Sequence, residues 1–292
     1  MIDSPPNTLA GNSFLHSVSL FHAEANAVDS APIEPIQRQA LEESAATGLP
    51  TVVSASDTHE SASEVTSALA FPIYQESSIK SFLLFAVGNS PEAVGVFEVW
   101  TPVGRHQELA LSTGFFGKLE RFQNVSSFVR FEKGTGLPGQ AWSRKHSIIH
   151  DNLANHPGFL RAAGASAEAL QTAIGIPIFA PNFLATVILI SSESTPLAQG
   201  VEVWTRKDER KFELHAAAYS PAASKGLKLN TGATSNGDGG LLGPCLATGN
   251  VSMVSEQESI FAGRPAPENC SGAVTIPTYL DGEISSITSL LL

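Results

Sequence analysis

Two cysteines offer the most reactive side chains in this sequence. Cys245 stands in Gly-Pro-Cys-Leu, where a turn is predicted to lead into a helix, and Cys270 comes shortly before an apolar strand. A helix N-terminus lowers the pKa of a thiol and so favours the nucleophilic thiolate. One hypothesis is therefore a redox enzyme, which predicts Cα atoms within about 7 Å of each other, the reach of a disulfide. The alternative, which we favour, is that both are small apolar side chains of the core.

Histidines and arginines in the middle of the chain are candidates for metal or anion binding. His146 and His150 lie four residues apart, but on a predicted strand, where this spacing is too long for one ion. No metal site is therefore predicted. Arg130 and Arg161 have the forked donors that suit phosphate or carboxylate. A surface salt bridge is the competing interpretation for each arginine, and the one we favour.

The composition argues against several classes of partner. The 292 residues include 17 basic and 28 acidic side chains, a net charge of −11. Such a surface repels nucleic-acid phosphates and anionic lipids, so neither a nucleic acid nor a membrane is expected as partner. The first residues lack the pattern of a signal peptide, and no apolar run approaches the roughly 20 residues of a membrane helix. The sequence predicts a cytosolic protein.

One short pattern occurs three times along the chain. Residues 70–74, 175–179 and 275–279 share a small or polar residue, an apolar residue, proline, any residue and an aromatic residue. Each copy is followed by a polar turn and a further apolar strand. Such a period predicts repeated structural units. Proline inside a strand predicts an edge position or a bulge.

Further landmarks divide the chain into three copies of unequal completeness. A Gly-Val strand ending in Val-Trp-Thr opens at Gly95 and again at Gly200. We expect a partial or permuted unit over 1–90, without such a strand, a complete unit over 94–192, and a degenerate one over 200–292. A helix followed by a strand is predicted in each, the middle helix with Pro138 at its first position. The short joins also suit hairpins between copies, so a frame in which sheets share strands of two copies stays open.

The middle copy carries a family resemblance. Its landmarks are Phe131, the run Gly-Thr-Gly-Leu-Pro-Gly-Gln-Ala-Trp at 134–142, and the segments 148–152, 159–162, 173–178 and 186–190. Their order and spacing over about a hundred residues resemble a GAF domain, a sensor fold that binds small molecules. The resemblance implies an α+β fold of antiparallel sheets flanked by helices, arranged as tandem GAF-like (PAS/GAF-type) domains.

The resemblance also implies a ligand pocket between the sheet and the segment that follows the helix after Gly136. The positions that match its wall are Phe128, Arg130, Trp142, Phe159, Arg161, Leu170, Thr172 and Ile174. A shared fold does not determine the chemistry, so neither the ligand nor a cofactor can be named. The expected function is a non-catalytic signalling or sensory protein that binds a small molecule or a signalling protein partner.

Two alternatives follow from the same residues. One branch of the family, the free methionine-R-sulfoxide reductases, places redox cysteines in the regions of Cys245 and Cys270. That branch has Gly-x-Cys-Gly and Ala-Cys-Asp contexts, whereas this chain has Gly-Pro-Cys-Leu and Asn-Cys-Ser. The other alternative is a structural regulator whose exposed strand edges pair with another chain. A homodimer is one form that such pairing could take.

Overall fold

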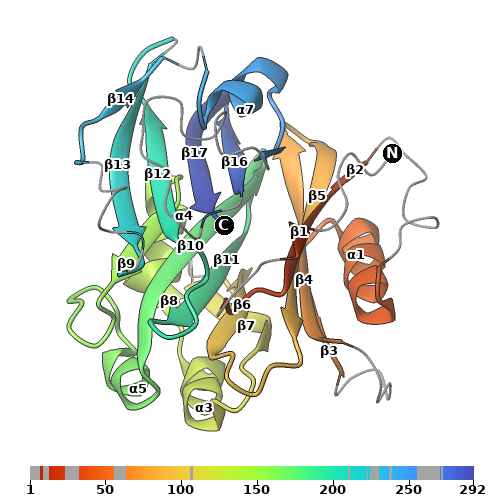
Figure 1. The fold of residues 1–292 in the computed structure, drawn as a ribbon, viewed down its shortest axis with the longest axis vertical. Helices are drawn as coiled ribbons and strands as arrows, with labels where there is room; N and C mark the ends of the chain where they lie inside the picture. Colours follow the sequence, from red (N-terminus) through yellow and green to blue (C-terminus); the bar gives the residue numbers. More distant parts are fainter. Residues whose placement is uncertain are drawn as a thin grey trace.

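The computed structural model describes residues 7–8, 13–23, 33–55, 64–105, 108–209, 211–221, 223, 230–236, 239–254, 270 and 272–292. Their strands form three sheets, which we call the first, middle and third sheets (Figure 1). All strand pairings in these residues are antiparallel. The predicted fold of antiparallel sheets with helices packed on them is observed.

The first sheet has the order β1-β2-β5-β4-β3. Its strands are β1 (Asn7–Thr8), β2 (Ser17–His22), β3 (Thr51–Ser54), β4 (Val65–Gln75) and β5 (Ser78–Gly88). Helix α1 (Pro35–Thr47) packs on β4 and β3. Proline at its first position needs no N–H partner, and the Gln37 side chain accepts a hydrogen bond from the Glu34 backbone to close a capping box.

The middle sheet has the order β8-β7-β6-β11-β10-β9. Its strands are β6 (Gly95–Val103), β7 (Glu108–Phe115), β8 (Phe131–Glu132), β9 (Ile148–Asp151), β10 (Leu170–Ala180) and β11 (Asn182–Ser192). Helices α3 (Glu120–Phe128), α4 (Gly136–Arg144) and α5 (Ala162–Ala167) accompany it. Helix α4 begins at Gly136, so Pro138 occupies the third helical position instead of the predicted first. Its missing N–H is still one that the first turn leaves unbonded.

The third sheet repeats this order as β14-β13-β12-β17-β16-β15. Its strands are β12 (Gly200–Arg206), β13 (Phe212–Tyr219), β14 (Thr234–Ser235), β15 (Ser252–Val254), β16 (Ala273–Leu280) and β17 (Glu283–Leu291). Helix α7 (Gly243–Thr248) contacts β16. Among the described residues, no helix combines the length and apolar character that a membrane crossing requires.

In each sheet, the strand that comes last along the chain pairs with a strand from the beginning of the same copy. β5 pairs with β2, β11 with β6 and β17 with β12. The other edge of each of these strands pairs with the strand that precedes it in the chain. Neither edge is left for the first strand of the next copy, so the hairpins that we considered between copies do not form. β2 also supplies the strand that the sequence pattern did not reveal in the first copy. Its residues, Ser-Val-Ser-Leu-Phe-His, carry no Val-Trp signature.

The three repeated prolines take the positions expected of proline in a strand, at an edge or beside a bulge. Pro72, Pro177 and Pro277 each lie beyond the last residue that pairs with the short outer strand β3, β9 or β15. Each also comes one residue before a register shift in its hairpin. A proline at such a position removes no ladder hydrogen bond on the outer side. The predicted edge or bulge positions are thus observed.

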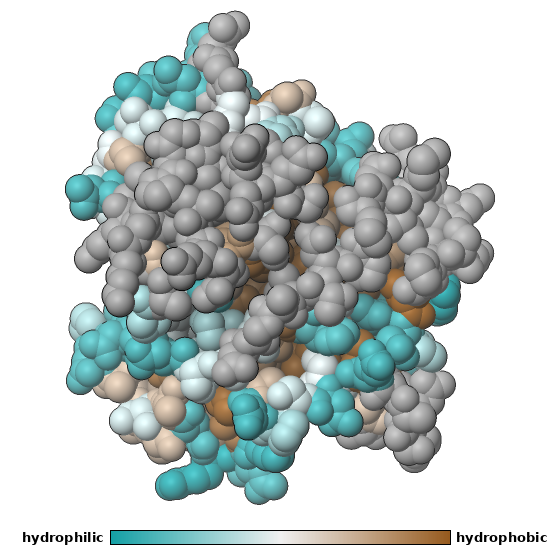
Figure 2. Space-filling view, in the orientation of Figure 1, coloured by the Kyte–Doolittle hydropathy of each residue, from teal (hydrophilic) through white to brown (hydrophobic). Residues whose placement is uncertain are grey.

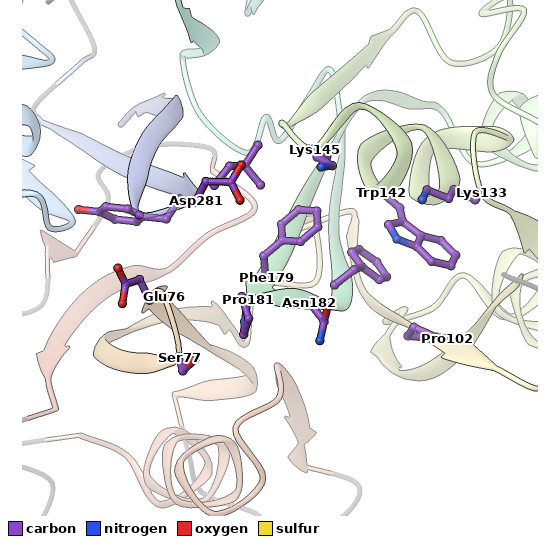
Figure 3. A pocket seen from close by; sticks show the side chains of 14 residues that line it. Glu76, Ser77, Pro102, Lys133, Trp142, Lys145, Phe179, Pro181, Asn182 and Asp281 are labelled. Atoms are coloured by element: carbon purple, nitrogen blue, oxygen red, sulfur yellow. The ribbon is translucent and has the colours of Figure 1, made fainter. Parts of the chain in front are cut away.

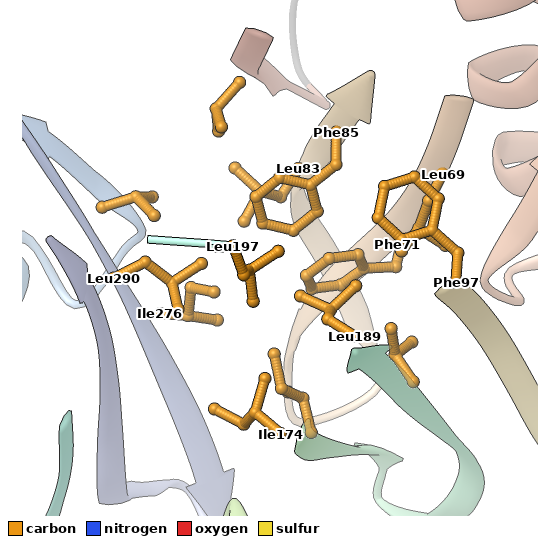
Figure 4. Close-up of a cluster of buried hydrophobic side chains, with 14 of the residues drawn as sticks. Leu69, Phe71, Leu83, Phe85, Phe97, Ile174, Leu189, Leu197, Ile276 and Leu290 are labelled. Atoms are coloured by element: carbon orange, nitrogen blue, oxygen red, sulfur yellow. The ribbon is translucent and has the colours of Figure 1, made fainter. Parts of the chain in front are cut away.

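The three sheets share one hydrophobic core. A cluster of buried side chains joins Leu69 and Phe85 of the first sheet, Phe97 and Ile174 of the middle sheet, and Leu290 of the third (Figure 4). Strands β4, β10 and β16, which carry the repeated prolines, contact one another in pairs. Figure 2 shows apolar colour in the middle of the face, where the sheets meet, and hydrophilic side chains along its lower edge. The repeated motif therefore forms the centre of the molecule.

Candidate functional site

Three of the predicted pocket-wall residues lie together in the buried cluster beneath α3 and α5. Phe159, Arg161 and Leu170 are 3%, 4% and 2% exposed. Arg161 forms a salt bridge with Glu98, and its second amino nitrogen donates to the other carboxylate oxygen at 2.9 Å. It also donates to Ser126 Oγ at 2.5 Å. Arg161 is thus held by protein groups in a buried ion pair, in place of the surface salt bridge that we favoured.

Aromatic rings surround the same guanidinium. Its central carbon lies 4.5 Å from the ring centre of Phe122, 5.3 Å from that of Phe159 and 5.5 Å from that of Trp100. The indole N–H of Trp100 donates to Glu98 at 2.9 Å. In the third sheet, Trp204 donates in the same way to Glu202 at 3.0 Å. The repeated tryptophans therefore hold buried glutamates of the sheet.

The structure separates the other predicted wall residues from this cluster. Ile174 belongs to the central core between the sheets, whereas Leu170 faces the helices. Two residues of one strand four apart should share a face, but a register shift between Leu170 and Thr172 reverses the alternation. Thr172 donates to Asp151 at 2.7 Å. The eight residues do not line one pocket, and their role as ligand contacts stays a prediction.

Three wall residues lie nearer the surface. Phe128 is 85% exposed at the end of α3. Arg130 is exposed and donates to the backbone oxygen of Val129 at 3.0 Å. Trp142 of α4 stacks on Phe183 with ring centres 4.6 Å apart, at the rim of a cavity described below. Of the eight residues, Trp142 alone lines that cavity.

Both cysteines are buried, and the Cys270 thiol donates a hydrogen bond to the Gly272 backbone oxygen at 3.3 Å. They belong to one cluster of the third sheet, with Cys245 in α7 and Cys270 ahead of β16. Burial raises the pKa of Cys245 to about 12 and that of Cys270 to about 11. The expected lowering by the helix N-terminus is wrong for Cys245, because loss of hydration in the core outweighs the dipole of a short helix. The interpretation as core side chains fits the burial of both thiols.

We expect the native thiols to react slowly with a disulfide reagent such as dithionitrobenzoate. With raised pKa values, the reactive thiolates form only as the pH approaches 11 to 12. At pH 8 the folded chain should react at least tenfold more slowly than the chain unfolded in guanidinium, because a rise of one pKa unit lowers the thiolate fraction about tenfold. Stopped-flow absorbance measures both rates. Equal rates in the two states would contradict the buried placement.

His146 and His150, the two histidines considered for metal binding, make separate ring contacts. His146 meets His215 of β13 edge to face at 4.8 Å. His150 stacks on His156 at 3.8 Å, and its Nε2 lies 3.3 Å from Gln140 Oε1. Burial, with a smaller effect of His156, lowers the pKa of His150 to about 4. Among the described residues, no group of three His, Cys, Asp or Glu side chains is placed to hold a metal ion.

A cavity of about 790 Å³ lies where the turns of three hairpins meet. The turns join β4 to β5, β10 to β11 and β16 to β17. Glu76 and Asp281 line one side, and Trp142 with Lys133 lines the other (Figure 3). The remaining lining residues are Ser77, Pro102, Lys145, Phe179, Pro181, Asn182, Phe183, Tyr279, Leu280 and Gly282. The cavity thus combines an aromatic surface with charges of both signs.

The aromatic residues of two of the repeated motifs each bond the end of a helix. Tyr74 donates its hydroxyl to the backbone oxygen of Gly48 at 2.8 Å, and Tyr279 donates to that of Gly249. Both glycines end their helices in the left-handed conformation. In the middle sheet, Phe179 takes the place of tyrosine, and Lys145 takes the place of glycine at φ +59°. Both departures face the cavity.

Most residues of the cavity were not predicted from the sequence. Lys133, Lys145, Glu76 and Asp281 stand in or near polar turns, which by pattern alone are solvated loops. One signal was available within the repeat, since the aromatic position that ends the motif holds tyrosine in two copies and phenylalanine in the middle one.

No family model matches this chain, and no curated protein sequence matches it. Among solved structures, a free methionine-R-sulfoxide reductase from Neisseria meningitidis in complex with its substrate is 18% identical over 33% of this chain and 51% of its own, with a TM-score of 0.26. The GAF domain of A. aeolicus nlh2 in an inactive state is 18% identical over 34% of this chain and 59% of its own, with a TM-score of 0.28. The GAF domain of an Acinetobacter phosphoenolpyruvate-protein phosphotransferase is 15% identical over 34% of this chain and 55% of its own, with a TM-score of 0.26.

The matched region therefore spans between half and three fifths of these three structures. The activities named for them belong to those proteins. Over about a third of its length, this chain is similar to GAF domain structures.

Proposed function

We propose that this protein is a cytosolic, non-catalytic sensory or signalling module that binds a small molecule where its three hairpin turns meet. The observation that carries the proposal is the cavity of about 790 Å³. Small-molecule sites are typically clefts of roughly 300–1,000 Å³ with apolar walls and a few polar groups. The stacked pair of Trp142 and Phe183 supplies such a wall, and Lys145 and Asp281 supply polar groups.

Two further features support this proposal over the redox alternative. Neither cysteine lines the cavity, and burial raises the pKa of both thiols. A catalytic thiol needs the opposite, a lowered pKa in an accessible, electropositive setting.

The test begins with native mass spectrometry of the purified chain and a thermal-shift screen of nucleotides, tetrapyrroles, amino acids and methionine sulfoxide. A compound that binds only the folded state, at about a hundred times its Kd, should raise Tm by several degrees. Each active compound is then tested on Phe183→Ala, which opens the aromatic wall, and on Phe128→Ala, the same change at an exposed site.

A cavity ligand should lose its effect with Phe183→Ala and keep it with Phe128→Ala. Tryptophan fluorescence gives a second readout, because Trp142 lines the cavity whereas Trp100 and Trp204 are buried elsewhere. The proposal fails if the mass is that of the polypeptide alone and no compound shifts Tm. It also fails if every shift persists unchanged in Phe183→Ala.

A further inference from the structure

We propose that the cavity selects an aromatic zwitterion, of which a free aromatic amino acid is the simplest example, with the carboxylate held by Lys145. This inference rests on the proposed function and names its ligand class.

The helix ends show that Lys145 and Phe179 form a matched pair. A Cβ atom added at Gly48 would lie 2.6 Å from the Tyr74 hydroxyl, and one added at Gly249 would lie 2.7 Å from the Tyr279 hydroxyl. A side chain at this helix end would therefore require the tyrosine hydroxyl to move from the position in which it bonds the helix end. The middle hairpin has both changes together, lysine at the helix end and phenylalanine at the ring.

This pair is unfavourable for folding when taken alone. Lys145 adopts a left-handed conformation, φ +59°, that a side chain takes only with strain. The phenylalanine also forgoes the hydrogen bond that tyrosine makes to the helix end in the other two copies. The change brings an ammonium group to the cavity. A site that departs from the local rule in this way is a candidate for function.

Opposite charges reach the cavity from the neighbouring sheets. Glu76 comes from the turn of the first sheet and Asp281 from that of the third, whereas Lys133 follows β8 and Lys145 ends helix α4. Within the described part of the chain, none of these four groups forms a salt bridge. Figure 3 shows the two carboxylates on one side, with Lys145 between them and Trp142. A ligand with a carboxylate and an ammonium group matches both sides.

The apolar surface between the charges is aromatic. Phe179 meets Phe183 edge to face at 5.5 Å, and Phe183 stacks on Trp142 at 4.6 Å. Lys133 lies over the Trp142 ring, 5.3 Å from its centre. Lys145 is the lysine nearer the two carboxylates (Figure 3). An aromatic ring of the ligand can extend this series, since aromatic pairs prefer stacked or edge-to-face contacts.

The experiment is calorimetric titration of the full chain with four probes that share a benzene ring. L-phenylalanine carries both charges, 3-phenylpropionate only the carboxylate, 2-phenylethylamine only the ammonium group, and benzyl alcohol neither. Each charge-assisted contact should be worth roughly tenfold in Kd. We expect L-phenylalanine to bind about tenfold more tightly than either singly charged probe, and benzyl alcohol to bind most weakly.

The decisive variant is the double substitution Lys145→Gly with Phe179→Tyr, which gives the middle hairpin the residues of the other two. It should fold with unchanged or raised Tm. Glycine relieves the left-handed strain, and tyrosine can donate to the backbone oxygen at the helix end, as in the other two copies. L-phenylalanine should bind it at least tenfold more weakly. Asp281→Asn keeps a residue that is tolerated in the left-handed region. This variant should bind L-phenylalanine more weakly and should bind 3-phenylpropionate with unchanged affinity. The control is Lys118→Gln, an exposed lysine outside the cavity.

The outcomes separate this inference from the proposed function. Equal affinities for the four probes, or tight binding of L-phenylalanine to the double variant, would overturn the zwitterion class while leaving a cavity that binds small molecules. The same conclusion follows if none of the probes binds but a compound from the thermal-shift screen does. Failure of the probes and of the whole screen would overturn both proposals.

Discussion

Replacement of Arg161 by methionine is expected to lower the free energy of unfolding by about 3–5 kcal/mol, the usual result of removing one partner of a buried ion pair. The Arg161 and Glu98 side chains are 1% and 0% exposed. Methionine keeps much of the volume among the surrounding rings but leaves the Glu98 carboxylate buried with only Trp100 and Ser126 as donors. Urea unfolding followed by circular dichroism measures the change.

The control for this prediction is a surface pair. Lys207 and Glu213 form a salt bridge with both side chains partly exposed, so Lys207→Ala should change stability by less than about 1 kcal/mol. Adding Glu98→Gln to Arg161→Met removes the uncompensated charge and keeps an acceptor for Trp100. The double variant should therefore be more stable than Arg161→Met alone. If the double variant lost the sum of the free energies lost by Arg161→Met and by Glu98→Gln alone, that result would contradict the ion-pair explanation.

Phe97→Ala is the second substitution with a large expected effect, about 3–5 kcal/mol of destabilisation from lost burial and the cavity left behind. Phe97 is fully buried in the central core, 5.2 Å from the ring of Phe14 and 6.4 Å from that of Phe115. Since this core joins all three sheets, the loss should destabilise the whole chain. Unfolding monitored by tryptophan fluorescence and by circular dichroism should still give coincident transitions.

Phe128→Ala is the matched control, because it makes the same chemical change at a side chain that is 85% exposed. Its effect should stay within about 0.5 kcal/mol, as is usual for surface substitutions. If Phe97→Ala instead separated the fluorescence and circular dichroism transitions, the sheets would be unfolding independently. The shared core would then not act as one cooperative unit.

The middle hairpin links stability to the proposed function. The first and third hairpins use tyrosine and glycine, which satisfy the helix end. The middle hairpin uses phenylalanine and lysine, which do not. If the double variant is more stable than the natural chain and binds no ligand, the departure from the repeat is a stability cost retained for binding, as is common at functional sites.

Local features of the fold were accessible from the sequence because they depend on neighbours in the chain. Alternating apolar residues with turn residues between them predicted the antiparallel strands, and Pro72, Pro177 and Pro277 predicted edge or bulge positions. Strand β2 escaped prediction because six residues without a repeated signature do not stand out. The pocket wall was misplaced in part because a bulge near Leu170 reverses which side chains face the helices.

The sequence by itself thus determined the hairpins, the irregular pairing beside their prolines and the repetition of one motif three times. Only the tertiary structure decided that β4, β10 and β16 would meet, and hence that Glu76, Lys145 and Asp281 would face one cavity. The physical reason is that β10 is buried on both faces. Alternation along a strand distinguishes two faces, but when both are apolar it does not say which one packs against the other sheets.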